Sequence, residues 1–258
     1  MAEYYCSYEM GPKTVSGFDW NTALIMNDEY GGRPVPLTPG DSLPYQVQHH
    51  TDIKRLSTFT GNLESALADW IRDADFVFGC FAWLTNRTVL DALAGLKYGC
   101  QVVVQKEDFL RPDSGWTSQS NVELRERYER LRCGMSQYEC PSIAARLSTN
   151  WCHDISPVRC AGVSPADRKM TWPRMHHKLA VACKCEVDEA ELRFFPYSVW
   201  TGSFNPTANG SRSRENAVVI DSESAAEFFI EEWAKVFAMS EPLDWAYEWC
   251  APEYRLGT

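Results

Sequence analysis

Residues 75–105 read DFVFGCFAWLTNRTVLDALAGLKYGCQVVVQ, and this stretch indicates the fold. The continuous apolar run over 75–83 is typical of a strand buried on both faces. Leucines at helical spacing predict a helix over 88–98, with Gly99 as its C′ residue, and 101–105 resembles a second strand. A strand–helix–strand unit predicts a right-handed crossover and a largely parallel sheet.

The same patterns extend outward from this unit. Alternation, apolar runs and helical spacing predict further elements: helices over 62–73, 122–131 and 224–239, and strands over 176–183, 192–201 and 216–221. We therefore expect a single α/β domain over 1–258. It carries an irregular, proline-rich N-terminal arm over 1–47 and a cysteine-rich insertion over 107–172.

Composition excludes several classes of protein. The chain has 258 residues, of which 45% are hydrophobic and 23% charged, so it can bury a large core and is not disordered. No stretch of 18 apolar residues occurs, and residues 1–6 lack the features of a secretory signal, so we expect a cytoplasmic protein without stable membrane association. The net charge of −10 does not favour nucleic acid, and any phosphate site must depend on local basic residues.

The polar residues that suggest chemistry lie between His176 and Glu215. Alternate side chains of a strand share a face, so His176 and Lys178 are expected to face one pocket while His177 faces away. The run 202–205, Gly-Ser-Phe-Asn, follows another predicted strand, and Glu215 precedes a third. Taken alone, the His-x-Lys pair is better explained as polar residues at the solvent edge of a strand, and the 202–205 and Glu215 matches favour a site instead.

In this order, the motifs resemble the phospholipase D superfamily, and most closely its small endonucleases with a single His-x-Lys motif. The matching segments are His-His-Lys at 176–178, Thr-Gly-Ser-Phe-Asn at 201–205 and Glu-Asn-Ala-Val-Val-Ile at 215–220. The resemblance implies an α/β/α sandwich in which helices flank a mixed sheet. It also implies a phosphodiesterase that needs neither metal nor cofactor, most simply a nuclease acting on DNA or RNA.

The resemblance also assigns roles to the residues. His176 would attack phosphorus and form a phosphohistidine, while Lys178 and Asn205 hold the equatorial oxygens. The Ser203 hydroxyl would add a donor, and Glu215 would orient a histidine ring. A second histidine must protonate the leaving group, and the chain has only one His-x-Lys motif. The resemblance therefore implies a homodimer whose two subunits share the site.

Two departures from the family pattern stand out. The family has an aspartate five residues after the lysine, where this chain has Cys183, and Asp188 is a candidate substitute. The segment between Lys178 and Gly202 is also about a dozen residues longer than usual for the family, which predicts an extended hairpin or loop. A phospholipase or phosphatidyltransferase is an alternative enzyme. The loss of the aspartate favours a third reading, an inactive nucleic-acid-binding or assembly module.

Candidate binding residues lie around the motifs. Arg174, Arg212 and Arg214 are expected to guide a phosphate backbone to the site, with ordinary surface charge as the alternative. Trp172 and Trp200 flank the motif strands, where core packing is expected before base stacking.

The cysteines allow a second kind of site. Candidate zinc ligands in the insertion are Cys133, Cys140, Cys152 and Cys160, with His153 nearby. No close C-x2-C pair occurs there, so we expect separate reduced thiols first. The Cys183-Lys184-Cys185 pair and the His49-His50 pair are weaker candidates.

Overall fold

The computed structural model describes residues 47–111, 118–135, 155–164, 174–188 and 191–248, together with the backbone of four short strands. Those strands form two antiparallel pairs, β1 (Ile25–Asn27) with β2 (Arg33–Val35) and β6 (Leu147–Ser148) with β11 (Arg255–Leu256). Most of the predicted N-terminal arm and parts of the predicted insertion lie outside the described residues. The single-domain organisation stays a prediction.

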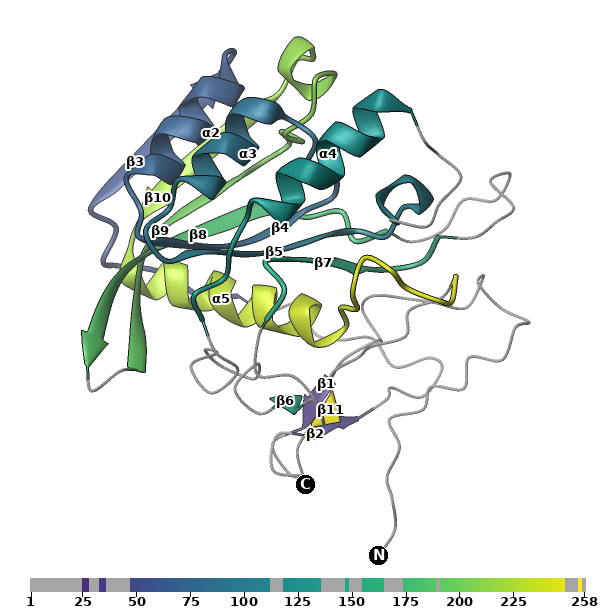
Figure 1. The fold of residues 1–258 in the computed structure, drawn as a ribbon. Coiled ribbons are helices and arrows are strands. Elements are labelled where there is room, and N and C mark those ends of the chain that lie inside the picture. The colour runs from purple at the N-terminus through teal and green to yellow at the C-terminus, as the bar shows by residue number, and fades with distance from the viewer. Residues whose placement is uncertain are drawn as a thin grey trace, which may run out of the picture.

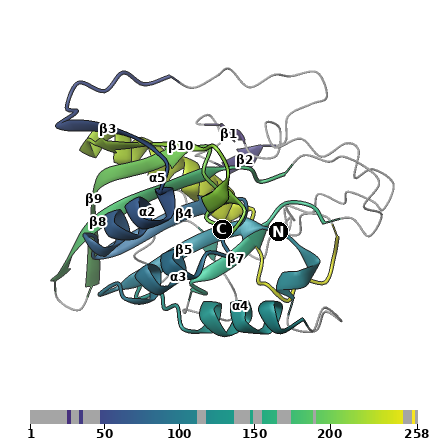
Figure 2. The same cartoon turned by 90° about the horizontal axis from the view of Figure 1, so that it is seen from above.

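A seven-stranded mixed sheet forms the centre of the molecule, in the order β3-β10-β9-β8-β4-β5-β7 (Figure 2). Its strands are β3 (Arg55–Thr60), β4 (Phe76–Phe81), β5 (Gly99–Gln105), β7 (Val158–Ala161), β8 (Lys178–Asp188), β9 (Glu191–Gly202) and β10 (Asn216–Asp221). Only β4–β5 and β5–β7 pair in parallel. The expectation of a largely parallel sheet is wrong, because β8, β9 and β10 follow one another as antiparallel neighbours.

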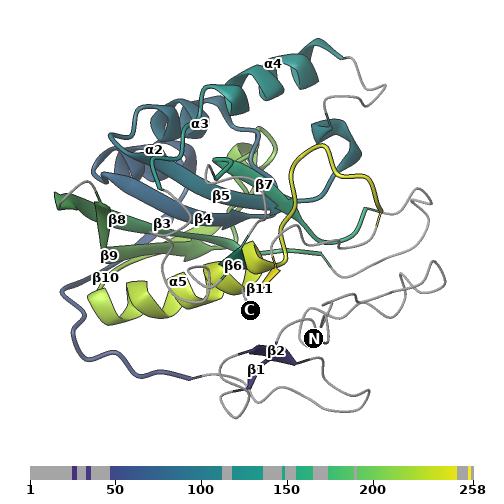
Figure 3. The same cartoon turned by 60° about the horizontal axis from the view of Figure 1, so that its bottom comes forward.

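Helices cover both faces of this sheet (Figures 1 and 3). One face, called here the three-helix face, lies under α2 (Leu63–Arg72), α3 (Arg87–Ala94) and α4 (Gln119–Glu129). The opposite face carries α5 (Glu223–Ala238). Two short 3-10 turns, η3 (Asp108–Leu110) and η6 (Gly210–Arg212), complete the described elements. The predicted α/β/α sandwich with a mixed sheet is confirmed.

The helix after β4 ends earlier than its pattern predicts. It stops at Ala94 with Gly95 as the C-cap, so Gly99 is not the C′ residue. Gly99 instead begins β5 with φ +87°, and a Cβ there would lie 1.9 Å from the carbonyl oxygen of Arg132. Close approach of two backbones therefore explains this glycine.

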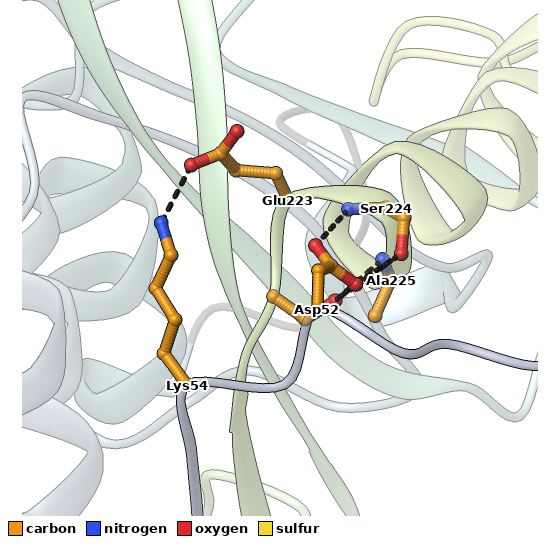
Figure 4. A network of polar contacts seen from close by, with 6 residues as sticks. Asp52, Lys54, Glu223, Ser224 and Ala225 are labelled. Atoms are coloured by element: carbon orange, nitrogen blue, oxygen red, sulfur yellow. Dashed lines mark hydrogen bonds and ion pairs between the residues drawn. The ribbon is translucent and has the colours of Figure 1, made fainter.

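The start of α5 is tied to the segment before β3 (Figure 4). Ser222 is the N-cap, its Oγ accepting from Ala225 N at 3.1 Å and donating to Asp52 Oδ1 at 2.6 Å. Asp52 Oδ2 also accepts from Ser224 N at 3.0 Å, and Lys54 pairs with Glu223 at 2.7 Å. These hydrogen bonds lower the pKa of Asp52 and fix the residues before β3 against the helix.

The predicted extended hairpin is the β8–β9 pair. Its outer part, from Lys184 to Asp188, projects beyond the sheet and is largely exposed (Figure 1). The register shifts between Ala182 and Cys183, which marks a bulge at the point where the hairpin leaves the sheet. Among the described residues, no helix is long and apolar enough to cross a membrane.

Candidate active site

One end of the sheet collects the predicted polar residues. Because β8, β9 and β10 are antiparallel, the start of β8, the end of β9 and the start of β10 meet at this end, which we call the site edge. His176 lies two residues before β8, Ser203 directly follows β9, and Glu215 directly precedes β10. Residues separated by about 40 positions are thereby brought together at the site edge.

His176 and Lys178 are in direct contact, as the strand periodicity predicts. Lys178 Nζ lies 2.8 Å from Nδ1 and 3.0 Å from Nε2 of His176 and donates to the His176 carbonyl oxygen at 2.8 Å. The Lys178 side chain is buried, whereas His176 is exposed. His177 points to the α5 face, where its Nε2 lies 3.0 Å from Glu232 Oε1.

The surroundings favour a neutral imidazole. Partial burial lowers the pKa of His176, and the positive charges of Lys178 and Arg174 lower it further. Burial also lowers the pKa of Lys178, against the opposing effect of Glu215. A neutral ring nitrogen is the form of histidine that attacks an electrophile, so His176 is suited to act as a nucleophile near neutral pH.

Ser203 and Glu215 form a second cluster at the site edge. The Ser203 hydroxyl donates to Glu215 Oε2 and accepts from Asn216 N at 3.1 Å. Glu215 was expected to orient a histidine ring, but here its carboxylate accepts from Ser203. Asn205 Oδ1 is buried without a hydrogen-bond partner, so the acceptor of this amide is unsatisfied.

Arg174 joins the site through two residues that sequence reasoning missed. Its Nη1 lies 3.0 Å from Glu107 Oε1, and its guanidinium lies 5.5 Å from the centre of the Trp83 ring. Trp83 Nε1 donates to the same Glu107 oxygen at 3.1 Å, and the Trp83 and His176 rings meet edge-on at 5.6 Å. Trp83 lies two residues beyond β4. Its proximity to His176 follows from the pairing of β4 with β8, which the sequence alone does not indicate.

The other predicted substrate-binding residues are less closely joined to this cluster. Arg212 belongs to η6 and Arg214 precedes Glu215, and both are exposed. Trp200 is fully buried and stacks on Phe59 with ring centres 5.6 Å apart, so it packs in the core as expected. Trp172 lies outside the described residues.

The structure explains the departure at Cys183 only in part. Cys183 is fully buried on the α5 face, and burial raises the pKa of its thiol. Asp188 cannot replace the family's aspartate, because it lies at the far end of β8, about 30 Å from Lys178 along the strand. There it pairs with Arg193 at 2.9 Å.

The proposed zinc cluster is not assembled by the described cysteines. The backbone of Cys133 forms an isolated β-bridge with Gly99 at the start of β5. Cys160 lies opposite Val104 in the β5–β7 ladder, about 16 Å further along β5. Cys140, Cys152 and His153 lie outside the described residues. Within the part of the chain that the structure describes, no three His, Cys, Asp or Glu side chains form a metal-binding group.

The weaker candidates have structural roles. Burial raises the pKa of Cys185 to about 12, so this thiol is protonated and unreactive at neutral pH. His50 lies 2.9 Å from Ser224 Oγ and packs edge-on against Phe228, which places it at the start of α5 and not at the site edge.

Comparison with known proteins gives one relative and several similar structures. No family model matches the chain. Uncharacterized protein L381 of Acanthamoeba polyphaga mimivirus is 30% identical over 212 residues, which cover 76% of this chain and 71% of that protein.

Similar solved structures include NucT from Helicobacter pylori, with 14% identity and a TM-score of 0.45, covering 72% of this chain and 97% of that one. Nuc from Salmonella typhimurium, a phospholipase D family member, has 18% identity and a TM-score of 0.40 at the same coverage. Phosphatidylserine synthase of Haemophilus influenzae Rd KW20 has 14% identity and a TM-score of 0.37, covering 80% of this chain and 42% of that one.

Proposed function

The chain belongs to the same family as uncharacterized protein L381 of Acanthamoeba polyphaga mimivirus, and we propose that it is a phospholipase D-type phosphodiesterase that cleaves nucleic acid. One observation carries the proposal. His176, whose pKa is lowered, is exposed at the site edge, the end of the sheet where β8 begins. The Nζ of the buried Lys178 lies 2.8 Å from its ring, and Ser203 and Glu215 lie at the same end of the sheet. This arrangement provides a neutral nucleophile and a fixed positive charge at one point.

The proposed first step is attack of a His176 ring nitrogen on the phosphodiester. A phosphorus–nitrogen bond forms, the bond from phosphorus to the leaving oxygen breaks, and that oxygen takes a proton from a general acid. Lys178 shifts its hydrogen bonds from the imidazole to a phosphoryl oxygen, and the side-chain N–H of Asn205 and the Ser203 hydroxyl donate further hydrogen bonds. Water then gives a proton back to the general acid and attacks phosphorus, the phosphorus–nitrogen bond breaks, and the neutral ring is regenerated.

The general acid is the reason for proposing a homodimer. His177 cannot serve, because its side chain lies on the α5 face and contacts Glu232. The chain has no second His-x-Lys motif, so we propose that a second copy supplies its own His176 to the shared site. Activity per chain then falls when dilution dissociates the dimer, which analytical ultracentrifugation and cleavage rates measured over one concentration series would test.

Nucleic acid is the proposed substrate because basic residues lie close to the site motifs in an otherwise acidic chain. Arg174 lies beside His176, and Arg212 and Arg214 precede Glu215. Phosphate contacts from such residues make binding weaken as salt rises. Neutralising Arg212 and Arg214 together is therefore expected to raise KM and to reduce its salt dependence.

The decisive experiment is cleavage of labelled single- and double-stranded DNA and RNA in excess EDTA. The native chain should cleave at least one of these substrates, and His176→Ala should lose at least 100-fold in rate. His177→Ala is the matched control and should stay within a few-fold of native. Cleavage that needs added metal, or that survives in His176→Ala, would overturn the mechanism. Headgroup release from lipid vesicles without nucleic-acid cleavage would overturn the substrate class, and binding without any turnover would overturn the enzyme.

A further inference from the structure

Trp83 is the cross-strand neighbour of His176. The ladder between β4 and β8 pairs Phe81 with Lys178 and continues through a hydrogen bond from Ala82 N to His177 O at 2.9 Å. One residue further, Trp83 faces His176 on the same side of the sheet, and their rings meet edge-on at 5.6 Å and 82°. Cross-strand pairs of this kind restrict each other's rotamers.

The orientation of the Trp83 indole is itself held by a residue in the turn after β5 and by Arg174. Its Nε1 donates to Glu107 Oε1 at 3.1 Å, and Glu107 directly follows Lys106 in the turn after β5. Arg174 lies 3.0 Å from the same oxygen and places its guanidinium over the indole. The indole is half-buried, so these contacts, more than enclosure, determine its orientation.

Lys178 alone does not determine which nitrogen of the His176 ring is aimed at phosphorus. Its Nζ lies at nearly equal distances, 2.8 and 3.0 Å, from the two ring nitrogens, and the imidazole is exposed. The lysine contacts therefore do not distinguish Nδ1 from Nε2 as the nitrogen that attacks phosphorus. A nucleophile needs one nitrogen aimed at phosphorus, and an error of about 1 Å can reduce the rate about 100-fold.

We infer that Trp83 is a positioning residue that sets the ring orientation of His176, and that Glu107 acts through Trp83 by holding the indole in place. The inference rests on the proposed role of His176 as the nucleophile. With Trp83 and Glu107 included, the residues that shape the site come from β8, from the segment after β4 and from the turn after β5. Trp83 does not touch the reacting atoms, so its effect is on the rate of the chemical step and not on substrate affinity.

The first test uses NMR without substrate, so it does not depend on the activity. In protein with labelled histidine rings, His176→Asn assigns the His176 signals. The native protein should show His176 ring protons displaced by the indole ring current. Trp83→Leu should abolish the displacement, and Trp83→Phe should keep part of it. Trp70→Leu is the matched control, because Trp70 is also half-buried with one hydrogen bond, to Ser198 at 3.0 Å, away from His176.

The same samples report the pKa of His176. Charged or titratable groups around it are Arg174, His177 and Lys178 in its own segment of the chain, Glu107 beyond Trp83, and Glu215 near Lys178. Trp83→Leu is expected to raise the pKa toward the ordinary value of about 6.5, because less of the ring is then buried. Identical His176 shifts and pKa in native protein and Trp83→Leu would overturn the inference, whatever the protein cleaves.

The second test measures cleavage kinetics in EDTA. Trp83→Leu and Glu107→Ala should each lower kcat about 10- to 100-fold with KM within twofold of native, and Trp83→Phe should recover part of the loss. A raised KM with unchanged kcat would overturn the inference and make Trp83 a stacking surface for a base. If the native protein cleaves nothing, the proposed function fails while the NMR result still decides the contact.

Discussion

Gly202 joins β9 to the Ser203 cluster, and replacing it with alanine should damage both stability and activity. Its φ is +154°, and a Cβ there would lie 2.4 Å from the carbonyl oxygen of Asn216 and 2.8 Å from Cα of Ala217. An ordinary carbon–oxygen contact is about 3.3–3.6 Å, so β9 and β10 would have to separate by about 1 Å. Backbone strain of this kind costs about 1–3 kcal/mol.

The separation of β9 and β10 in Gly202→Ala would also move the Ser203 and Glu215 cluster. Ser203 N donates to the carbonyl oxygen of Asn216 at 3.1 Å, and the Ser203 hydroxyl bridges to Glu215, so separating the strands moves the whole cluster. A shift of about 1 Å predicts a loss of about 100-fold in kcat for cleavage in EDTA. Urea denaturation measures the stability, with Gly95→Ala as the control, because a Cβ there meets its neighbours at 3.5 Å or more. Native-like stability and rate in Gly202→Ala would refute the reasoning.

Three further predictions concern charge and burial. Because the pKa of His176 is lowered and cleavage needs one neutral ring as nucleophile and one protonated ring as general acid, kcat should peak below about pH 6.5 and decline on either side, as a pH–rate profile would show. Cys183→Asp should cost about 3–5 kcal/mol in urea denaturation by burying an unpaired charge, while Cys183→Ser should cost less; equal losses would contradict this. The hydrogen bond from His177 lowers the pKa of Glu232, so this carboxylate stabilises the fold above its unfolded pKa of about 4.5 and loses that effect as pH falls through the lower folded value. Glu232→Gln should therefore be destabilised near pH 7 and match the native protein near pH 3.

The sequence predicts elements well where a periodic pattern coincides with burial. β10 runs over Asn216–Asp221 as predicted, and the 224–239 pattern gives α5 within a residue at each end. The helix over 88–98 is overextended, because Leu96 keeps the helical spacing after the helix has ended at Gly95. Periodicity reports which side chains are buried and not where the backbone leaves the helix.

The sequence predicts which site residues of one strand share a face, but not which residues of different strands lie together. The i and i+2 rule places His176 with Lys178, because strand alternation is local. Trp83 and Glu107 escape this reasoning, since their relation to His176 depends on which strands are neighbours in the sheet. The same limitation applies to Asp188, which is close in sequence to the expected aspartate position yet lies far from the site along β8.

The mixed connectivity of the sheet has a consequence for the order of folding. β8, β9, β10 and α5 follow one another in sequence, whereas pairing of β4 with β8 joins segments on the order of a hundred positions apart. Closing that loop costs entropy that the local hairpins avoid. We therefore expect φ-values for mutations in the β8–β9 hairpin to exceed those in β4. Lys178 and Ser203 would then come together early, when β8, β9 and β10 pair with one another. Trp83 would contact His176 only later, when β4 pairs with β8.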